Sequence, residues 1–203
     1  MDDQPADNDK RGAGYTADAR FWRAGAIAAT LFMSAVLAIL TVDSLKAIRA
    51  GGSQVPSYEV INRHIGYEYS PEKRECVPEV GGEEPLFGAH YDEAQAAALI
   101  ARGKLVIQSR ACMDCHTFFG NGAYYAPDLT KAWLDPLWMS FPPDKRGAAM
   151  IAFLMEPFHV GYHVMPNLHF THDEAQAAVA YLKWMSAVDT NGFPDCTGRN
   201  PAK

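Results

Sequence analysis

The chain has 203 residues, enough for one domain of ordinary size with additional segments. Its formal net charge of -6 and its pI of 5.6 argue against a nucleic-acid-binding protein, because no basic stripe accompanies the aromatic residues. The acidic balance allows a basic protein partner instead. The length of the chain predicts a single hydrophobic core.

The N-terminal part of the chain joins a polar tail to a long apolar segment. Residues 1–19 are rich in Asp, Gly and Ala and predict a loosely ordered tail. Residues 24–42 carry no charge, and at helical rise they cover most of the hydrocarbon thickness of a bilayer. Phe21 and Trp22 precede them, where aromatic side chains favour the membrane interface. We therefore predict a transmembrane anchor helix over residues 20–50.

The charges around the apolar segment predict its orientation. More basic residues lie before it than directly after it, so the positive-inside rule places the N-terminus in the cytoplasm. A cleaved signal peptide is the alternative, but the apolar stretch exceeds a usual signal core and no small-residue cleavage site follows closely. The part of the chain after the anchor is therefore expected on the outer side of the membrane. The basic residues are Lys10, Arg11, Arg20 and Arg23 on one side and Lys46 and Arg49 on the other.

Residues 51–90 are dense in Gly, Pro and Glu and predict a linker or insertion of uncertain fold. Short strands are expected at residues 58–61 and 65–69. This segment contains Cys76, and Cys196 lies near the C-terminus. In an oxidising compartment these two cysteines form a disulfide or remain free thiols. We predict the disulfide, because neither cysteine has another partner.

A helix predicted over residues 92–109, with Asp92 as its N-cap, leads to the sequence Cys-Met-Asp-Cys-His. Two thiols three positions apart, followed directly by histidine, form the attachment signal of a c-type haem. Cys112 and Cys115 are then expected to bind the haem covalently, and His116 to ligate its iron. A redox Cys-x-x-Cys or half a zinc site is the alternative, but zinc needs four ligands and the other cysteines are isolated.

A haem with one histidine ligand needs a second axial group. Met165 lies in a proline-bound segment after the middle of the domain, and a thioether ligand there would raise the reduction potential. His159, His163 and His169 are the competitors, and any of them would give a bis-histidine haem of lower potential. We predict Met165, because pairing of Met with His is the usual arrangement in electron carriers.

Residues 118–127 combine glycines that permit tight turns with aromatic residues that can cover a haem. The carbonyl of Pro127 is expected to accept a hydrogen bond from the far nitrogen of His116 and to hold the ring in place. Further helices are expected over residues 129–137 and 146–158, and a capping box of Thr171 and Glu174 opens a last helix to about residue 187.

These patterns together predict a mainly α protein. A single N-terminal transmembrane helix is followed by a class I-like cytochrome c domain. The expected divisions are a cytoplasmic tail over 1–19, the anchor over 20–50, the uncertain segment over 51–90 and a monohaem domain over 91–203.

Three stretches, CMDCHTFFGNGAYYAPDLTKAW, VMPNLHFTHDEA and YLKWMSAVDTNGFP, resemble the membrane-anchored cytochrome c subunit of bacterial nitric oxide reductase. The resemblance implies an electron-transfer subunit with no bond-making chemistry of its own. Its donors would be soluble periplasmic proteins, either a cytochrome c or a cupredoxin. Its acceptor would be a large membrane subunit with haem b, haem b3 and a non-haem iron, where nitric oxide becomes nitrous oxide.

Carried onto this chain, the resemblance implies covalent haem at Cys112 and Cys115, His116 and Met165 as axial ligands, and Pro127 as the partner of the histidine. It also implies a calcium ion near the subunit boundary, to which a backbone oxygen around Gly122 would contribute. Two other functions fit an anchor and a haem. One is a free-standing membrane-anchored electron shuttle, and the other is a cytochrome c subunit of a haem-copper oxygen reductase.

The segment before the haem domain carries an acidic run of Glu79, Glu83 and Glu84. This run predicts either a surface that attracts a basic electron donor or a merely solvated acidic segment.

Overall fold

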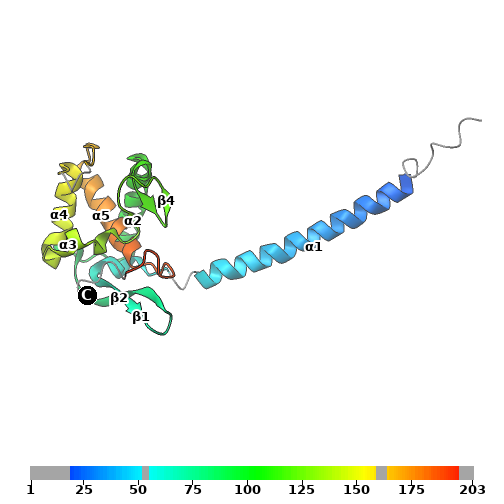
Figure 1. Cartoon of the computed structure of the whole chain (residues 1–203), viewed down its shortest axis with the longest axis horizontal. Helices are drawn as coiled ribbons and strands as arrows, with labels where there is room; N and C mark the ends of the chain where they lie inside the picture. Colours follow the sequence, from blue (N-terminus) through cyan, green and yellow to red (C-terminus); the bar gives the residue numbers. More distant parts are fainter. Residues whose placement is uncertain (1–18, 52–54, 159–163, 197–203) are drawn as a thin grey trace, which may run out of the picture. The chain divides into compact units, whose positions relative to one another are not determined.

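The computed structural model describes residues 19–51, 55–158 and 164–196, and the chain divides into two compact units over residues 1–52 and 53–203. The first unit holds the helix α1 (Ala19–Gly51) (Figure 1). Within Ala19–Ile48, the most apolar window of 18 residues has a mean hydropathy of 2.2, and none of that window is buried. A helix of this length and composition is able to cross a membrane.

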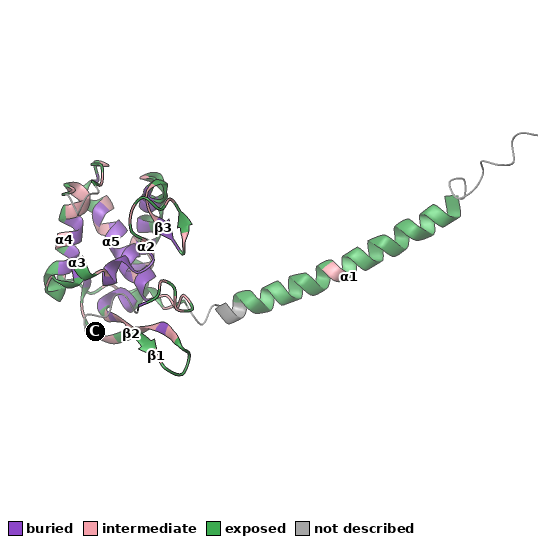
Figure 2. Ribbon diagram, in the orientation of Figure 1, coloured by how far each residue is buried: buried purple, intermediate pink, exposed green. Residues whose placement is uncertain are grey.

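The second unit is mainly helical, as predicted, and its core lies between helices (Figure 2). Among the described residues, two antiparallel pairs of strands accompany the helices. In chain order its elements are η2 (Tyr58–Asn62), β1 (Arg63–Ser70), β2 (Glu75–Glu83), η3 (Leu86–Gly88), α2 (Glu93–Ser109), η4 (Cys112–Asp114), β3 (Thr117–Phe118), β4 (Asn121–Gly122), η5 (Ala132–Leu134), α3 (Pro136–Met139), α4 (Pro143–Met155) and α5 (His172–Ser186).

Helices α2 and α5 pack against each other and form the centre of this unit. Both begin at the predicted caps, because the side chains of Asp92 and Thr171 each accept a hydrogen bond from the backbone of the third helical residue, in complete capping boxes. The helices lie close together at Gly103, where an added Cβ would be 2.0 Å from the carbonyl oxygen of Ala177. The missing side chain therefore allows the crossing.

The segment before α2 is folded and packs on the helices. Residues Tyr58–Asn62, expected in part as a strand, form a 3-10 helix instead. The prediction of a strand there is wrong because Val60 and Ile61 are both buried, whereas a strand with one buried face would alternate. The expected second strand lies within β1, which pairs with β2 in a hairpin. The Pro and Gly residues of β2 hid its strand character from the sequence.

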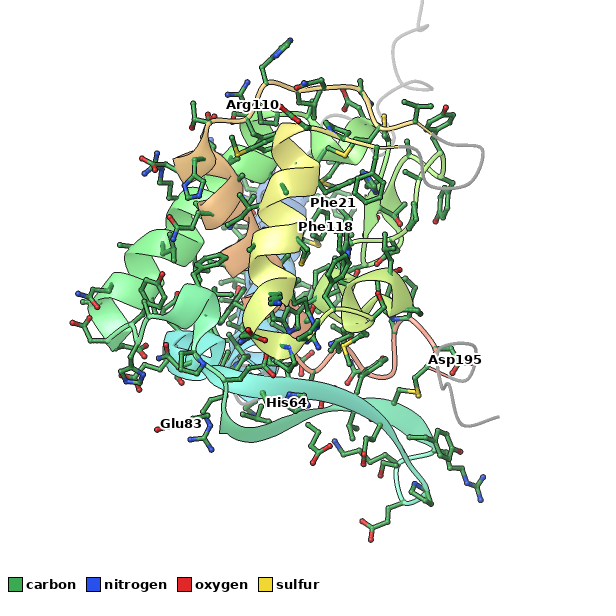
Figure 3. The ribbon with its side chains drawn as sticks, turned by 90° about the vertical axis from the view of Figure 1, so that its left-hand side faces the viewer. Phe21, His64, Glu83, Arg110, Phe118 and Asp195 are labelled. Carbon is green, nitrogen blue, oxygen red and sulfur yellow. A yellow bond between two sulfur atoms is a disulfide. The ribbon has the colours of Figure 1, made fainter. Side chains whose placement is uncertain are left out.

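The predicted disulfide between Cys76 and Cys196 is present, with 5.8 Å between the two Cα atoms. It joins β2 to the segment that follows α5. The hydroxyl of Tyr67 in β1 also donates to the carbonyl of Pro194 at 2.9 Å. The hairpin is therefore fixed to the C-terminal segment, close to the labelled Asp195 in Figure 3.

The middle of the unit departs from its two expected helices. Residues 129–137 contain only the short elements η5 and α3, separated at Asp135, which adopts an extended conformation. Pro136 causes this break, since proline disfavours a helical conformation in the residue before it. Helix α4 begins at Pro143, earlier than expected, because proline is well suited to the first helical position. It ends at Met155 rather than at residue 158.

Candidate haem site

The two cysteines of the attachment signal lie in one tight turn directly after α2. Ala111 adopts a left-handed conformation (φ 52°) that ends the helical run, and the backbone nitrogens of Cys115 and His116 both donate to the carbonyl of Cys112, at 3.3 and 2.9 Å. Both thiols are unpaired, one buried and one partly exposed. The turn therefore holds the thiols and the imidazole together.

Burial raises the pKa of the Cys112 thiol to about 11. A reactive redox cysteine needs the opposite shift, because the thiolate is the nucleophile. The environment of Cys112 therefore does not suit a thiol-disulfide oxidoreductase. It does suit an apolar group bound to the sulfur, such as the vinyl-derived edge of a haem.

The imidazole of His116 is held by the backbone. Its Nδ1 lies 2.7 Å from the carbonyl oxygen of Pro127. A carbonyl only accepts, so Nδ1 carries the proton and Nε2 keeps a free lone pair. This tautomer is the one that an iron ligand requires, so the residues present fit a c-type haem.

Hydrogen bonds fix the loop between His116 and η5. The hydroxyl of Thr117 donates to Asp128 at 2.6 Å, the backbone nitrogen of Phe119 donates to the hydroxyl of Thr130 at 2.7 Å, and Leu129 donates to the carbonyl of Thr117 at 2.8 Å. These bonds join the two ends of the loop. The position of the Pro127 carbonyl is therefore set by the loop around it.

Gly122 lies within this loop, with φ of 125°. An added Cβ would be 2.2 Å from the carbonyl oxygen of His116, so only glycine fits. The calcium expected near Gly122 remains a prediction. Within the described ranges, acidic, His and Cys side chains converge at only one place suited to a metal, around Cys76, Asp195 and Cys196, and the disulfide occupies both of those sulfurs.

The predicted second ligand, Met165, is partly buried and packs against the core. Among the competitors, His169 is exposed, with its backbone nitrogen bonded to the side chain of Asn167. His159 and His163 lie outside the described residues. The choice of Met165 over the histidines therefore remains a prediction.

Arg110 attaches the Met165 segment to the end of α2, a role that sequence reasoning missed. Its guanidinium donates to the carbonyl of Leu168 at 3.0 Å and to the Glu174 carboxylate at 2.7 Å, and it lies over the ring of Phe170. Hydrogen bonds from Thr171 and from Arg110 lower the pKa of the Glu174 carboxyl. The basic residue two positions before Cys112 was the only sequence signal for this contact.

A second missed feature is a group of buried cations. The described residues that are buried and charged are Lys131, Arg146 and Lys183, all of them cationic. The ammonium of Lys183 donates to the backbone carbonyl of Glu84 at 2.9 Å and lies 3.4 Å from its carboxylate, and His64 contacts the same carboxylate at 2.7 Å. Desolvation lowers the pKa of Lys183 to about 8. Glu84 is therefore an internal ion-pair partner, unlike the exposed Glu79 and Glu83.

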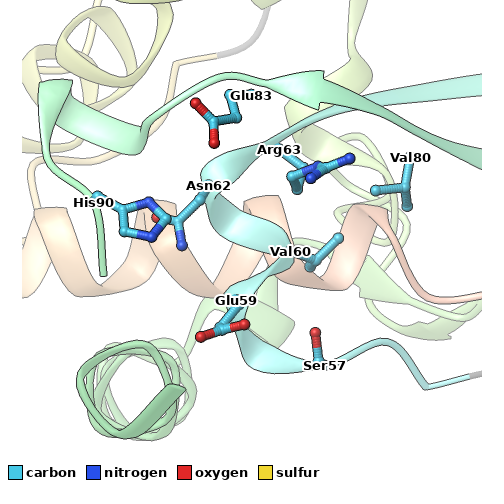
Figure 4. Close-up of a pocket in the computed structure, with 8 residues that line it drawn as sticks. All are labelled: Ser57, Glu59, Val60, Asn62, Arg63, Val80, Glu83 and His90. Atoms are coloured by element: carbon cyan, nitrogen blue, oxygen red, sulfur yellow. The ribbon is translucent and has the colours of Figure 1, made fainter. Parts of the chain in front are cut away.

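A pocket of about 300 Å³ lies apart from the attachment turn, lined by residues of η2, β1 and β2 and by His90 (Figure 4). Its polar side chains include those of Glu59, Arg63 and Glu83. They do not converge on a common point as metal ligands would, within the part of the chain that is described. None of the predicted haem residues lines this pocket.

Comparison with known proteins identifies the family of the chain. The cytochrome c family matches residues 100–186, and covalent haem c is the cofactor of that family. The C subunit of nitric oxide reductase from Paracoccus denitrificans is 31% identical over 108 residues, which cover 51% of this chain and 69% of the relative. The protein of the same name from Stutzerimonas stutzeri is 29% identical over 112 residues, covering 55% and 75%. The chain therefore belongs to the cytochromes c that form the C subunits of nitric oxide reductases.

Proposed function

We propose that the chain is the electron-transfer subunit of a membrane nitric oxide reductase complex. It receives electrons from a soluble periplasmic donor, a cytochrome c or a cupredoxin, and passes them to a large membrane subunit that reduces nitric oxide to nitrous oxide. The observation that carries the proposal is the attachment turn, where two unpaired thiols adjoin a histidine whose Nδ1 is bonded to Pro127. The names of the relatives supply the reaction.

In this proposal Cys112 and Cys115 hold the haem, and His116 and Met165 ligate its iron. The haem supplies the one-electron chemistry, and the protein positions it and sets its potential. The Pro127 carbonyl keeps the proton on Nδ1, so Nε2 would be available to ligate the iron through its lone pair. Arg110 binds the carbonyl of Leu168, three residues after Met165, and so attaches this segment to the end of α2.

The proposed location follows from α1. We infer that the helix spans the cytoplasmic membrane with its N-terminus inside, since basic residues are more frequent before its apolar span than after it. The second unit (residues 53–203), which we call the haem unit, then lies in the periplasm. The disulfide between Cys76 and Cys196 supports this side of the membrane, because such bonds persist in oxidising compartments.

The proposed partner is a large subunit with haem b, haem b3 and a non-haem iron. A calcium ion at the boundary between the subunits, near Gly122, belongs to the same proposal. Purification in mild detergent tests the partner. A stable complex that turns over nitric oxide supports the proposal, whereas a lone chain that exchanges electrons with several soluble proteins indicates a free shuttle.

Substitution of the proposed iron ligand tests the site. Met165→Ala should leave the haem covalently attached and abolish the weak red absorption band that a thioether gives to ferric haem. Met139→Ala is the matched control, because Met139 is exposed on α3. If the band is absent from the unaltered protein, or survives in Met165→Ala, the ligand is one of the histidines.

A further inference from the structure

The side chain of Arg110 joins the start of the attachment turn to the segment that contains Met165. Arg110 directly follows α2 and lies two positions before Cys112. Its Nη1 donates to the carbonyl of Leu168 at 3.0 Å, and its Nη2 donates to the two carboxylate oxygens of Glu174 at 2.8 and 2.7 Å. The guanidinium therefore binds both the backbone of this segment and the first turn of α5.

This contact is partly shielded from water. The side chains of Arg110 and Glu174 are 28% and 23% exposed, and the guanidinium carbon lies 5.6 Å from the centre of the buried Phe170 ring. Hydrogen bonds between ionised groups are stronger than neutral ones, and an aromatic face attracts a cation. By contrast, the ion pair of Arg102 with Asp173, also between α2 and α5, is 4.0 Å long and more than half exposed on both sides. Arg110 therefore makes the firmer connection.

The chain between Met165 and Leu168 has little conformational freedom. Pro166 has a fixed φ and restricts the backbone of the residue before it, Met165. The side-chain oxygen of Asn167 accepts a hydrogen bond from the backbone nitrogen of His169 at 2.8 Å, and His169 adopts a left-handed conformation with φ of 53°. A position fixed at Leu168 is therefore transmitted through a short, constrained link to Met165, which itself packs against the core.

We propose that Arg110 is a positioning residue for the axial thioether, and that it keeps Met165 at the haem iron by fixing Leu168 to the end of α2. The inference rests on the proposed haem site and extends it, since it assigns Arg110 no contact with the iron. Both ends of the connection adjoin the site, two residues before the first attachment cysteine and three residues after the proposed ligand. The alternative is an ion pair that only joins α2 to α5 and leaves the bond between iron and thioether unaffected.

Binding of added imidazole to the ferric, haem-loaded full chain tests the proposal. Imidazole binds the iron only where Met165 has left it, so the apparent affinity follows the population of the state in which the thioether is released. Loss of a hydrogen bond to a charged group, discounted for its partial exposure, shifts such an equilibrium by about tenfold. Arg110→Ala should therefore bind imidazole about tenfold more tightly, with the haem still attached and the thioether absorption band present before imidazole is added.

Three further variants separate positioning from general loosening of the unit. Arg102→Ala is the matched control, because it removes a cation between the same two helices and should leave the imidazole affinity unchanged. Arg110→Lys keeps a cation that can donate a hydrogen bond, and should restore part of the affinity of the unaltered protein. Glu174→Gln keeps a side chain suited to the capping box with Thr171 but removes the negative charge, and should tighten imidazole binding. Combined with Arg110→Ala, it should add nothing further, because both changes break the same contact.

The outcomes distinguish this inference from the proposed function. Unchanged imidazole affinity in Arg110→Ala, with haem attached and the thioether band intact, would show an ion pair without a positioning role and would overturn the inference alone. An equal gain in Arg102→Ala would overturn it as well, since any loosening of the helices would then suffice. If Arg110→Ala fails to accumulate with haem, unchanged affinity in both Arg110→Lys and Glu174→Gln overturns the inference. A thioether band missing from the unaltered protein would overturn the assignment of Met165 as a ligand, and the inference with it.

Discussion

The substitution Gly103→Ala should destabilise the haem unit by separating its two central helices. The added Cβ would lie 2.0 Å from the carbonyl oxygen of Ala177 and 2.7 Å from Cβ of Tyr181, whereas ordinary contact begins at 3.4 Å. Backbone atoms cannot rotate away as a side chain can, so α2 and α5 must move apart. Overpacking of this kind lowers the free energy of unfolding by up to about 3 kcal/mol. The higher helix propensity of alanine raises it by about 1 kcal/mol.

The expected net loss is therefore about 2 kcal/mol, or a Tm lower by about 4 to 8 °C for a unit of this size. Thermal and urea unfolding of the haem-loaded protein, followed in the haem absorption, would measure it. Gly82→Ala is the control, since a Cβ at Gly82 meets nothing within 4 Å. Equal stability of Gly103→Ala and the unaltered protein would refute the argument, because it would mean that the helices adjust without cost.

Three further predictions follow from the structure. Replacing Cys76 and Cys196 by Ser opens a loop with a sequence separation of 120 and should lower the free energy of unfolding by up to about 5 kcal/mol, measured by urea titration without reductant. The pKa of Lys183 is lowered to about 8 in the folded state, so between pH 8 and about 10.5 the folded state binds fewer protons than the unfolded chain. The free energy of unfolding should therefore rise with pH in this range, and Lys183→Met should abolish the rise. Urea unfolding titrations at each pH measure it. Reversing the exposed charges of Glu79 and Glu83 should weaken the salt dependence of electron entry from a basic cytochrome c, followed by stopped-flow, without changing transfer to the large subunit.

The sequence predicted correctly those parts of the fold that depend on contacts between residues close together in the chain. The N-caps at Asp92 and Thr171 require only a side chain and the backbone three residues later, so their helices begin where the sequence predicted. The contact of His116 with Pro127 spans eleven residues within a single loop. Its chemistry was predictable because a c-type haem requires the histidine to keep its proton on the outer nitrogen.

Contacts between distant segments were not predictable in the same way. Lys183 and Arg146 lie on helices whose charges would ordinarily face solvent, but both are buried and both lie over the ring of Trp133 in η5. The ion pair of Lys183 with Glu84 joins residues 99 positions apart. No periodicity in either segment reveals such a pair. The sequence therefore predicted Glu84 as part of a surface run and missed its internal partner.

The position of Glu84 changes what the acidic run can do. Its carboxylate is held by Lys183 and His64, so charge reversal at Glu84 would disrupt an internal ion pair as well as a surface field. Glu79 and Glu83 lie on β2, which the disulfide fixes to the C-terminal segment of the same unit. Their charges are thus rigidly connected to the domain that carries the haem signal. Charges on a flexible linker would only raise the local concentration of a basic donor, whereas fixed charges can also orient it toward the haem.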